Sequence, residues 1–207
     1  MLTQAGAGVG CGPKDAREFI ALCAAVRNNL PPKRYRHVLG VARTAERLAR
    51  RYGLHTGKAR VAAMLHDIAR NWSPHSLLEY ARAHDLEVSD QEMHAPVLLH
   101  AKVAASVARE QFGVIDPEVL AAIRHHTVAV PDMGELEKVL YIADAIEPSR
   151  TFLGRAALEA AAFRLLDEGM VACLAASFAY LQSNGIAVPP ASLALHRQLV
   201  NRLETHA

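Results

Sequence analysis

Cysteine and aromatic residues are scarce in this chain of 207 residues. Its three cysteines, Cys11, Cys23 and Cys173, lie far apart and form no CxxC pair. This pattern excludes a disulfide scaffold and a zinc ribbon, and it favours free thiols in a reducing compartment. Aromatic residues make up only 5% of the chain, whereas alanine and leucine dominate it. Since both of these are strong helix formers, the composition predicts an all-α fold.

Long apolar runs, a strong net charge and a secretion signal are also missing. The longest apolar run, residues 169–181, is shorter than the roughly 20 residues that a membrane span needs. A net charge of only +2 gives no reason to expect a nucleic-acid polymer or a membrane as partner. The start, MLTQAGAGVGCG, lacks the basic and apolar regions of a secretory signal. We therefore expect a cytoplasmic protein.

Several catalytic motifs are absent too. There is no nucleophile elbow and no GxxxxGK(S/T) loop, which argues against a serine hydrolase and a P-loop enzyme. The glycine-rich start is not followed by strand-like sequence, so it is not a dinucleotide-binding fingerprint.

Helical spacing and helix-ending residues divide the chain into segments. We expect residues 1–14, rich in glycine and alanine, to be disordered, and residues 15–207 to form one helical domain. Ser73 before Pro74 and Asp116 before Pro117 are N-terminal capping signals. The segment 84–96 reads as a connection. The predicted helices cover residues 15–29, 33–52, 56–70, 74–83, 96–112, 117–125, 135–146, 155–182 and 191–204.

Five predicted helices place a histidine or an aspartate on an apolar face. A single buried histidine is more often a hydrogen-bonded core residue than a metal ligand. Two buried carboxylates are harder to accommodate, because few cationic residues share these faces. A divalent ion compensates carboxylates and takes neutral imidazoles as ligands, so the set predicts a two-metal site in which Asp67 is able to bridge. The residues concerned are His37, His66, Asp67, His100, His126 and Asp144.

The order of these residues resembles the HD-domain superfamily of metal-dependent phosphohydrolases. More narrowly, five segments are similar to the YqeK-type symmetrical bis(5'-nucleosyl)-tetraphosphatases: KRYRHVLGV, AAMLHDIARN, LLHAKVAA, AIRHHT and LEKVLYIADAIEPSR. The resemblance covers about residues 33–152, the expected metal core. It implies an HD-domain helical bundle with the C-terminal helices of residues 153–207 packed on it.

The resemblance also implies an activity and a cofactor. The activity is hydrolysis of diadenosine tetraphosphate into two ADP by a metal-bridged hydroxide. The cofactor is two divalent ions, iron first, with manganese, zinc or cobalt as alternatives. One ion is implied to bind His37, His66, Asp67 and Asp144, and the other Asp67, His100 and His126. In the family an aromatic residue precedes the last of these histidines and a glycine follows it. Here His125 and Ala129 stand there instead, which leaves His125 as an alternative to His126.

Five residues are candidates for binding substrate phosphates: Arg70, Arg150, Lys102, Arg34 and Thr127. Arg70, one helical turn after His66, is the first choice, because a guanidinium grips phosphate oxygens with two hydrogen bonds. We give it a catalytic role beside His66 and Asp67. Glu147, one turn beyond Asp144, is either a residue that orients a ligand histidine or part of a surface salt bridge.

Other functions fit the same ligand set. The nearest is another HD-type nucleotidase or a phosphohydrolase of a signalling nucleotide, which product analysis separates. A di-iron oxygenase and a non-catalytic metal-binding module are more remote; oxygen uptake and metal-dependent stability test for them. The sequence leaves open the base preference of the enzyme and its oligomeric state, a homodimer included.

Overall fold

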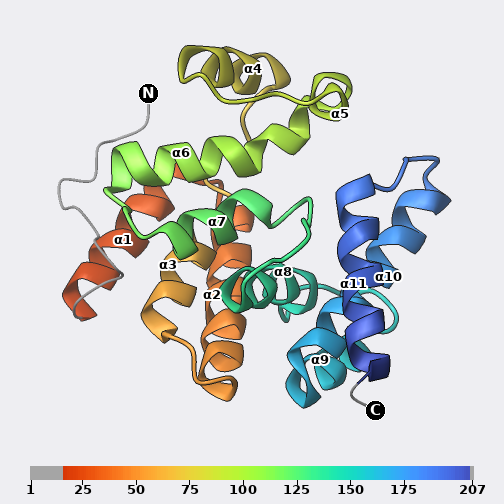
Figure 1. Cartoon of the computed structure of the whole chain (residues 1–207). Coiled ribbons are helices and arrows are strands. Elements are labelled where there is room, and N and C mark those ends of the chain that lie inside the picture. Colours follow the sequence, from red (N-terminus) through yellow and green to blue (C-terminus); the bar gives the residue numbers. More distant parts are fainter. Residues whose placement is uncertain (1–15, 206–207) are drawn as a thin grey trace.

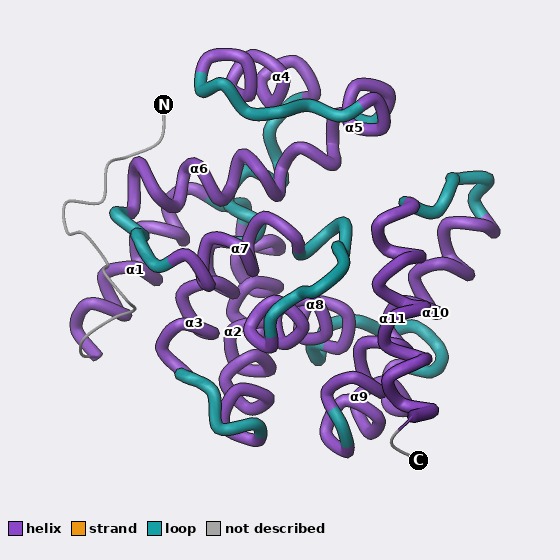
Figure 2. The backbone as a smooth tube through the Cα atoms, in the orientation of Figure 1, coloured by secondary structure: helices purple, strands orange, loops and turns teal. Residues whose placement is uncertain are grey.

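The computed structural model describes residues 16–205, and within that range all regular structure is helical, which confirms the all-α prediction (Figures 1 and 2). The expectation of disorder for residues 1–14 lies outside the described residues. The α-helices are α1 Ala16–Asn29, α2 Pro32–Arg51, α3 Thr56–Leu65, α4 Pro74–Ala83, α5 Asp90–His94, α6 His100–Phe112, α7 Pro117–His125, α8 Glu135–Ile146, α9 Arg155–Arg164, α10 Leu166–Ser183 and α11 Pro190–Thr205, and a 3-10 helix, η1, covers Pro96–Leu99.

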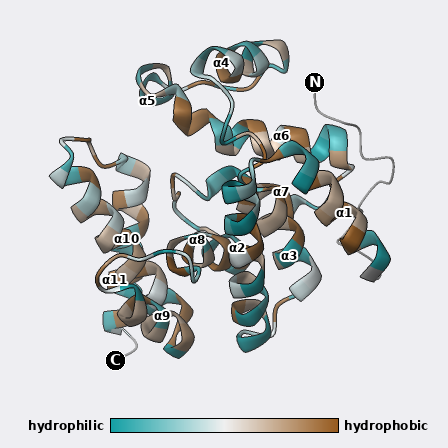
Figure 3. Ribbon diagram, turned by 180° about the vertical axis from the view of Figure 1, so that it is seen from behind, coloured by the Kyte–Doolittle hydropathy of each residue, from teal (hydrophilic) through white to brown (hydrophobic). Residues whose placement is uncertain are grey.

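Helices α2, α3, α7 and α8 form the centre of the molecule (Figure 1). Leu48, Leu65, Ile123 and Ile142, one from each, are fully buried between them. Burial of each such side chain contributes roughly 1.5–3 kcal/mol relative to exposure. The outer face of α2 carries arginines and is hydrophilic when seen from behind (Figure 3). This amphipathic pattern fixes which side of α2 faces the core, and that side includes His37.

Two layers flank this centre. Helices α4 and α5 lie above α6, and α9, α10 and α11 lie beside α8 (Figure 1). The C-terminal helices are attached to α8 and to the loop before it by polar contacts. Lys138 Nζ lies 2.6 Å from Asp167 Oδ1, and Ser192 Oγ donates to the carbonyl of Ala129 at 3.0 Å. No helix between residues 16 and 205 combines the length and apolar character needed to cross a bilayer.

Most helix ends follow the predicted signals. The Ser73 side chain accepts from Ser76 N at the start of α4, and Asp116 accepts from Glu118 N and Val119 N at the start of α7. Helix α8 has the predicted bounds. Gly113 ends α6 with a left-handed φ of 66°, a conformation that glycine adopts without strain.

Four boundaries differ from the prediction. The helix predicted for residues 96–112 starts as the 3-10 helix η1, and its α-helical part, α6, begins only at His100. The third helix ends at Leu65, and residues 66–72 continue as turns with bonds such as Arg70 N to Asp67 O. The connection at 84–96 contains α5, whose first turn is closed by a capping box between Ser89 and Glu92. The predicted long C-terminal helix is two helices, because Leu165 has extended dihedrals, φ −146° and ψ 130°.

Candidate metal centre

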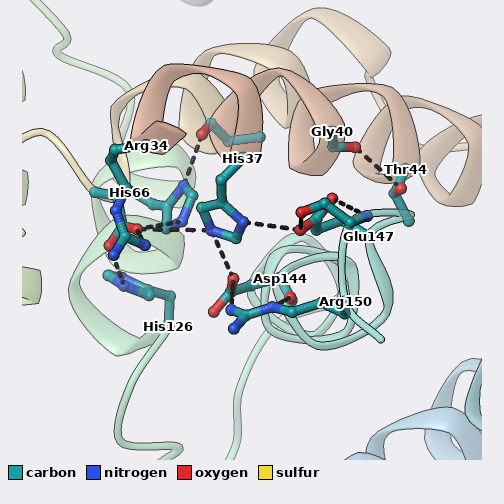
Figure 4. A network of polar contacts seen from close by, with 12 residues as sticks. Arg34, His37, Gly40, Thr44, His66, His126, Asp144, Glu147 and Arg150 are labelled. Atoms are coloured by element: carbon teal, nitrogen blue, oxygen red, sulfur yellow. Dashed lines mark hydrogen bonds and ion pairs between the residues drawn. The ribbon is translucent and has the colours of Figure 1, made fainter. Parts of the chain in front are cut away.

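Six side chains from five segments converge near the middle of the fold. One comes from α2, two from the turn that follows α3, one from the first residue of α6, one from the end of α7 and one from the last turn of α8. Figure 4 shows four of them, His37, His66, His126 and Asp144, pointing toward one another. The turn after α3 explains the HD pair: it lets His66 and Asp67, 0% and 3% exposed, both face inward.

The converging ligand atoms form two groups that share Asp67. Within each group they lie within 4.8 Å of one another; the groups are His37, His66 and Asp67, and Asp67, His100 and His126. Asp67 Oδ2 lies 3.6 Å from His37 Nε2 and 3.5 Å from His66 Nε2. Its other oxygen, Oδ1, lies 3.3 Å from His100 Nε2 and 3.7 Å from His126 Nε2. Each carboxylate oxygen therefore serves one group, which is the geometry of a bridging ligand.

Local hydrogen bonds fix the tautomers of three histidines. The Nδ1 atoms of His66, His100 and His126 contact the carbonyls of Ala63, Val97 and Ile123 at 2.7, 2.5 and 2.7 Å. A carbonyl only accepts, so each Nδ1 carries the proton and each Nε2 presents a lone pair. The Nε2 atoms of His100 and His126 nevertheless lie 3.1 Å apart. Two facing lone pairs repel unless a cation lies between them, so this pair fits a metal ion.

The other group fits a metal ion for a different reason. The Nε2 atoms of His37 and His66 are buried. His66 Nε2 has no hydrogen-bond partner among residues 16–205, and His37 Nε2 makes no well-aligned hydrogen bond there, although Asp144 Oδ1 lies 3.0 Å away. A buried polar atom without a partner is destabilising by about 1–3 kcal/mol. Metal coordination would satisfy both atoms at once. The donor set of imidazoles and carboxylates suits iron, manganese, zinc or cobalt alike.

Asp144 lies at the edge of the first group and has a cationic neighbour. Its Oδ1 is 3.0 Å from His37 Nε2 and 2.7 Å from an Arg150 nitrogen. Arg34, one turn before His37 on α2, donates to Asp67 Oδ2 at 2.7 Å (Figure 4). The expectation that few cations offset the two carboxylates is therefore wrong. Arg34 pairs with Asp67, and Arg150 pairs with Asp144. The helix ends that carry these residues meet only in the folded chain, so sequence position alone did not reveal the pairs.

The protonation states of His66, His100, Asp67 and Asp144 also suit metal binding. His37 differs, because burial works to lower its pKa but the carboxylates of Asp144, Glu147 and Asp67 raise it overall. Burial lowers the pKa of His66 to about 4 and lowers that of His100, so both rings stay neutral at neutral pH. Burial works to raise the pKa values of Asp67 and Asp144, but the adjacent imidazoles outweigh it and hold both values below the usual range. Neutral imidazoles and ionised carboxylates are the forms that bind a metal ion.

Glu147 orients His37, and the alternative of a surface salt bridge is wrong. The residue is 1% exposed. Its Oε1 accepts from His37 Nδ1 at 3.0 Å, and its Oε2 accepts from Ser149 N at 2.8 Å. Gly40 of α2 makes room for it, because a Cβ there would lie 2.4 Å from Glu147 Oε2. Sequence reasoning missed Gly40; its signal was a glycine inside a helix, which often marks a close approach.

The five phosphate-binding candidates separate in space. Arg34 and Arg150 contact the ligand carboxylates, as described above. Lys102 instead pairs with Glu92 Oε2 at 2.8 Å and with the carbonyl of Glu87 at 2.9 Å. Arg70 is half-buried, and its side chain makes no ion pair within residues 16–205. The structure thus brings Arg34 and Arg150 to the centre and gives the Arg70 side chain no ion pair with a ligand residue.

Thr127 and the two adjacent histidines mark the border between two cavities. Thr127 lines a cavity of about 650 Å³ together with His126, and a second one of about 290 Å³ together with His125. His125 Nδ1 lies 2.6 Å from Glu137 Oε1 and does not join the ligand groups, whereas His126 does.

Comparison with known proteins identifies the class to which this fold and site belong. Residues 34–149 match the family model of the HD domain, so the chain belongs to the HD domain family. Its relatives narrow the class further. The chain is 35% identical over 175 residues, 84% of this chain and 93% of the relative, to a symmetrical bis(5'-nucleosyl)-tetraphosphatase of Halalkalibacterium halodurans. It is 34% identical over 178 residues, 86% of this chain and 95% of the relative, to the protein of the same name in Bacillus subtilis.

A solved structure agrees with these relatives. The crystal structure of a predicted HD superfamily hydrolase involved in NAD metabolism from Clostridium acetobutylicum superposes with a TM-score of 0.85 at 33% identity. The superposition covers 89% of this chain and 97% of that one. The family and the clustered histidines and aspartates together indicate binding of divalent metal.

Proposed function

We propose that this protein is a metal-dependent hydrolase that cleaves diadenosine tetraphosphate symmetrically into two ADP. The observation that carries the proposal is Asp67, whose two oxygens face two separate ligand groups. A paired site of this kind suits hydrolysis of a phosphoric anhydride. The names of the relatives from Halalkalibacterium halodurans and Bacillus subtilis support the choice of substrate.

The proposed ligand set follows the geometry. Two divalent ions, iron first, would be held by His37, His66, Asp67 and Asp144 on one side and by Asp67, His100 and His126 on the other. When bound, such ions lower the pKa of a water between them and neutralise charge on phosphate oxygens. The carbonyl-bonded Nδ1 atoms hold the imidazole rings in place, so that no ring has to rotate when an ion binds.

Arg34 and Arg150 are the proposed phosphate-binding residues. Each now donates to a carboxylate that a metal ion would claim, Asp67 or Asp144. With the carboxylates held by ions, both guanidiniums would be free to turn toward phosphate oxygens, which a guanidinium grips with two hydrogen bonds. The four linked phosphates of the substrate carry more negative charge than two divalent ions offset, so cationic side chains are needed there. We assign this role to Arg34 and Arg150 ahead of Arg70 and Lys102, with Thr127 as a further hydroxyl donor.

Metal analysis combined with product analysis tests the proposal. The wild type, Asp67→Ala and Asp67→Asn are compared with Asp90→Ala, a matched change at an exposed aspartate of α5. We expect the wild type and Asp90→Ala to hold two ions per chain and to release only ADP. The Asp67 variants should lose metal and activity while circular dichroism shows an intact fold.

Three outcomes contradict the proposal. AMP together with ATP as products excludes symmetrical cleavage. An Asp67→Asn variant that keeps both metals and full activity excludes the shared ligand. Turnover that requires oxygen and leaves diadenosine tetraphosphate intact points to an oxygenase.

A further inference from the structure

The larger cavity, here called the α8–α10 cavity, begins at the metal centre. It measures about 650 Å³, a size usual for small-molecule sites. His126, Asp144 and Arg150 line it, so a molecule held in the cavity lies next to residues of the ligand groups. The remaining lining comes from Thr127, Tyr141, Ala145, Phe152, Leu158, Cys173, Ala176, Ser177 and Tyr180.

The rest of the cavity is built for a flat, partly apolar molecule. Two aromatic side chains in its wall, Phe152 and Tyr180, are 44% and 66% exposed. Large aromatic side chains are usually buried, and a pair left exposed in one cavity marks a surface for a ligand. Tyr141 and Cys173, which also line the cavity, are buried. Ser177 adds a hydroxyl to the lining.

The smaller cavity, on the other side of Thr127, has a different character. It measures about 290 Å³, and no phenylalanine, tyrosine or tryptophan of the described chain lines it. Its Lys102 is held by Glu92 and by the Glu87 carbonyl, and its His125 by Glu137. Two glutamates, Glu87 and Glu92, and two cations, Lys102 and Arg124, line this cavity, so its wall offers phosphates no excess of positive charge from these groups. The small volume leaves little space for a base.

We propose that the α8–α10 cavity binds the nucleoside of one half of the substrate, and that the other half is held by its phosphates alone. The base stacks on Tyr180 and Phe152, and Arg150 binds the phosphates that lead to the metal centre. Base stacking on aromatic side chains is sequence-tolerant, so purine identity is read weakly. This inference rests on the proposed function and adds to it a recognition site formed by the C-terminal helices.

Recognition of one end has a chemical consequence. A nucleoside tetraphosphate that lacks the second nucleoside offers every group that the site reads. Water then adds to phosphorus at the central anhydride, the bond between the second and third phosphates breaks, and adenosine 5'-tetraphosphate yields ADP and inorganic diphosphate. The structure therefore assigns this second substrate to the same site.

Binding of ADP to the metal-loaded protein tests the nucleoside site. Tyr180→Ala and Phe152→Ala should each weaken ADP binding about tenfold, since stacking on an aromatic side chain is worth about 1–3 kcal/mol. Inorganic triphosphate should bind all variants like the wild type. Ile186→Ala is the matched control, because Ile186 is also an exposed apolar residue of the C-terminal part but does not line the cavity. Metal content, measured in parallel, should not change.

The outcomes separate this inference from the proposed function. Equal ADP affinity in the wild type, Tyr180→Ala, Phe152→Ala and the double variant overturns the nucleoside site, even if diadenosine tetraphosphate is cleaved. A KM for adenosine 5'-tetraphosphate within about threefold of that for diadenosine tetraphosphate supports recognition of one end, and a KM more than about tenfold higher overturns it. If the wild type cleaves neither compound, the proposed function fails. ADP binding then decides the nucleoside site alone.

Discussion

Replacing Gly40 by alanine should damage the metal centre through Glu147. Gly40 lies inside α2, and an added Cβ would sit 2.4 Å from Glu147 Oε2 and 3.3 Å from Glu147 Cδ. The carboxylate cannot retreat easily, since it is 1% exposed and bonded to His37 Nδ1 and Ser149 N. Either Glu147 leaves its position or α2 moves away from α8.

The size of the effect follows from three terms. Overpacking a core contact is destabilising by about 1–3 kcal/mol. Losing the charged hydrogen bond between Glu147 and His37 adds about 1.5–3 kcal/mol if the carboxylate moves away. Alanine in place of glycine inside a helix stabilises the folded protein by roughly 1 kcal/mol. If the carboxylate moves away, we expect a net loss of about 1.5–5 kcal/mol in the free energy of unfolding, with a drop in metal affinity of about 10–100-fold.

A double-mutant cycle isolates the contact. Urea unfolding of the metal-free protein is measured for the wild type, Gly40→Ala, Glu147→Ala and the double variant. With Glu147 truncated, the alanine at position 40 has no carboxylate to displace. It should then be neutral or stabilising by up to about 1 kcal/mol. The reasoning is refuted if Gly40→Ala matches the wild type in stability and metal affinity, or if it is equally damaging in both backgrounds.

Two further predictions concern packing and pH. Burial works to raise the pKa of Asp116, but the Lys58 ammonium at 2.9 Å and the cap of α7 lower it overall. Ionised Asp116 therefore stabilises the folded protein above a pH of about 4, the pKa of an aspartate in the unfolded chain. This stabilisation is lost as the pH falls through the lower pKa that Asp116 has in the folded protein. Lys58→Met should raise the acid-unfolding midpoint seen by circular dichroism, and an unchanged midpoint would contradict this. Gly169→Ala places a Cβ 2.4 Å from Ala162 Cα. It should lower the unfolding free energy by about 1–3 kcal/mol in urea, whereas unchanged stability would exclude the tight α9–α10 contact.

Local signals in the sequence predicted much of the fold. Ser73 and Asp116 mark helix starts because their side-chain oxygens accept from backbone N–H groups a few residues ahead. Gly113 marks a helix end because its backbone takes a left-handed conformation. Such signals act within one helical turn, so a single sequence is enough to read them.

The break between α9 and α10 had no such signal. The stretch around Leu165 is rich in good helix formers and contains no proline. In the structure the chain turns there, and Gly169 packs against Ala162 of the preceding helix. The close approach of two helices is a tertiary interaction that outweighs helix propensity. The early end of α3 at Leu65 has a comparable origin, because the following turn carries His66 and Asp67 into the core.

The converging residues of the metal centre were recognisable in the sequence because burying a polar side chain on an apolar helix face is unfavourable in free energy unless it has a partner. Of the supporting residues, the sequence offered Glu147 and Arg34 as candidates without their partners, because the partners depend on which helix ends meet. Glu147 lies 110 residues from His37 in sequence, and Arg34 lies 33 residues from Asp67. Only the packing of α2 against α3 and α8 brings these pairs together. Sequence separation of this kind leaves no periodic trace.

The two ligand groups differ in how their histidine rings are held in place. His66, His100 and His126 each bond a carbonyl three residues earlier, in the last turn of α3, η1 or α7. Those carbonyls lie on the same local segment, so the three ring orientations survive small shifts between helices. His37 alone is oriented by a residue of another helix, Glu147 of the α8 end. A disturbance of the α2–α8 contact should therefore release the ion at His37 first and leave the one at His100 and His126 bound. In the proposed site, the affinity for the ion at His37 would thus depend on helix packing, and the affinity for the ion at His100 and His126 on local geometry.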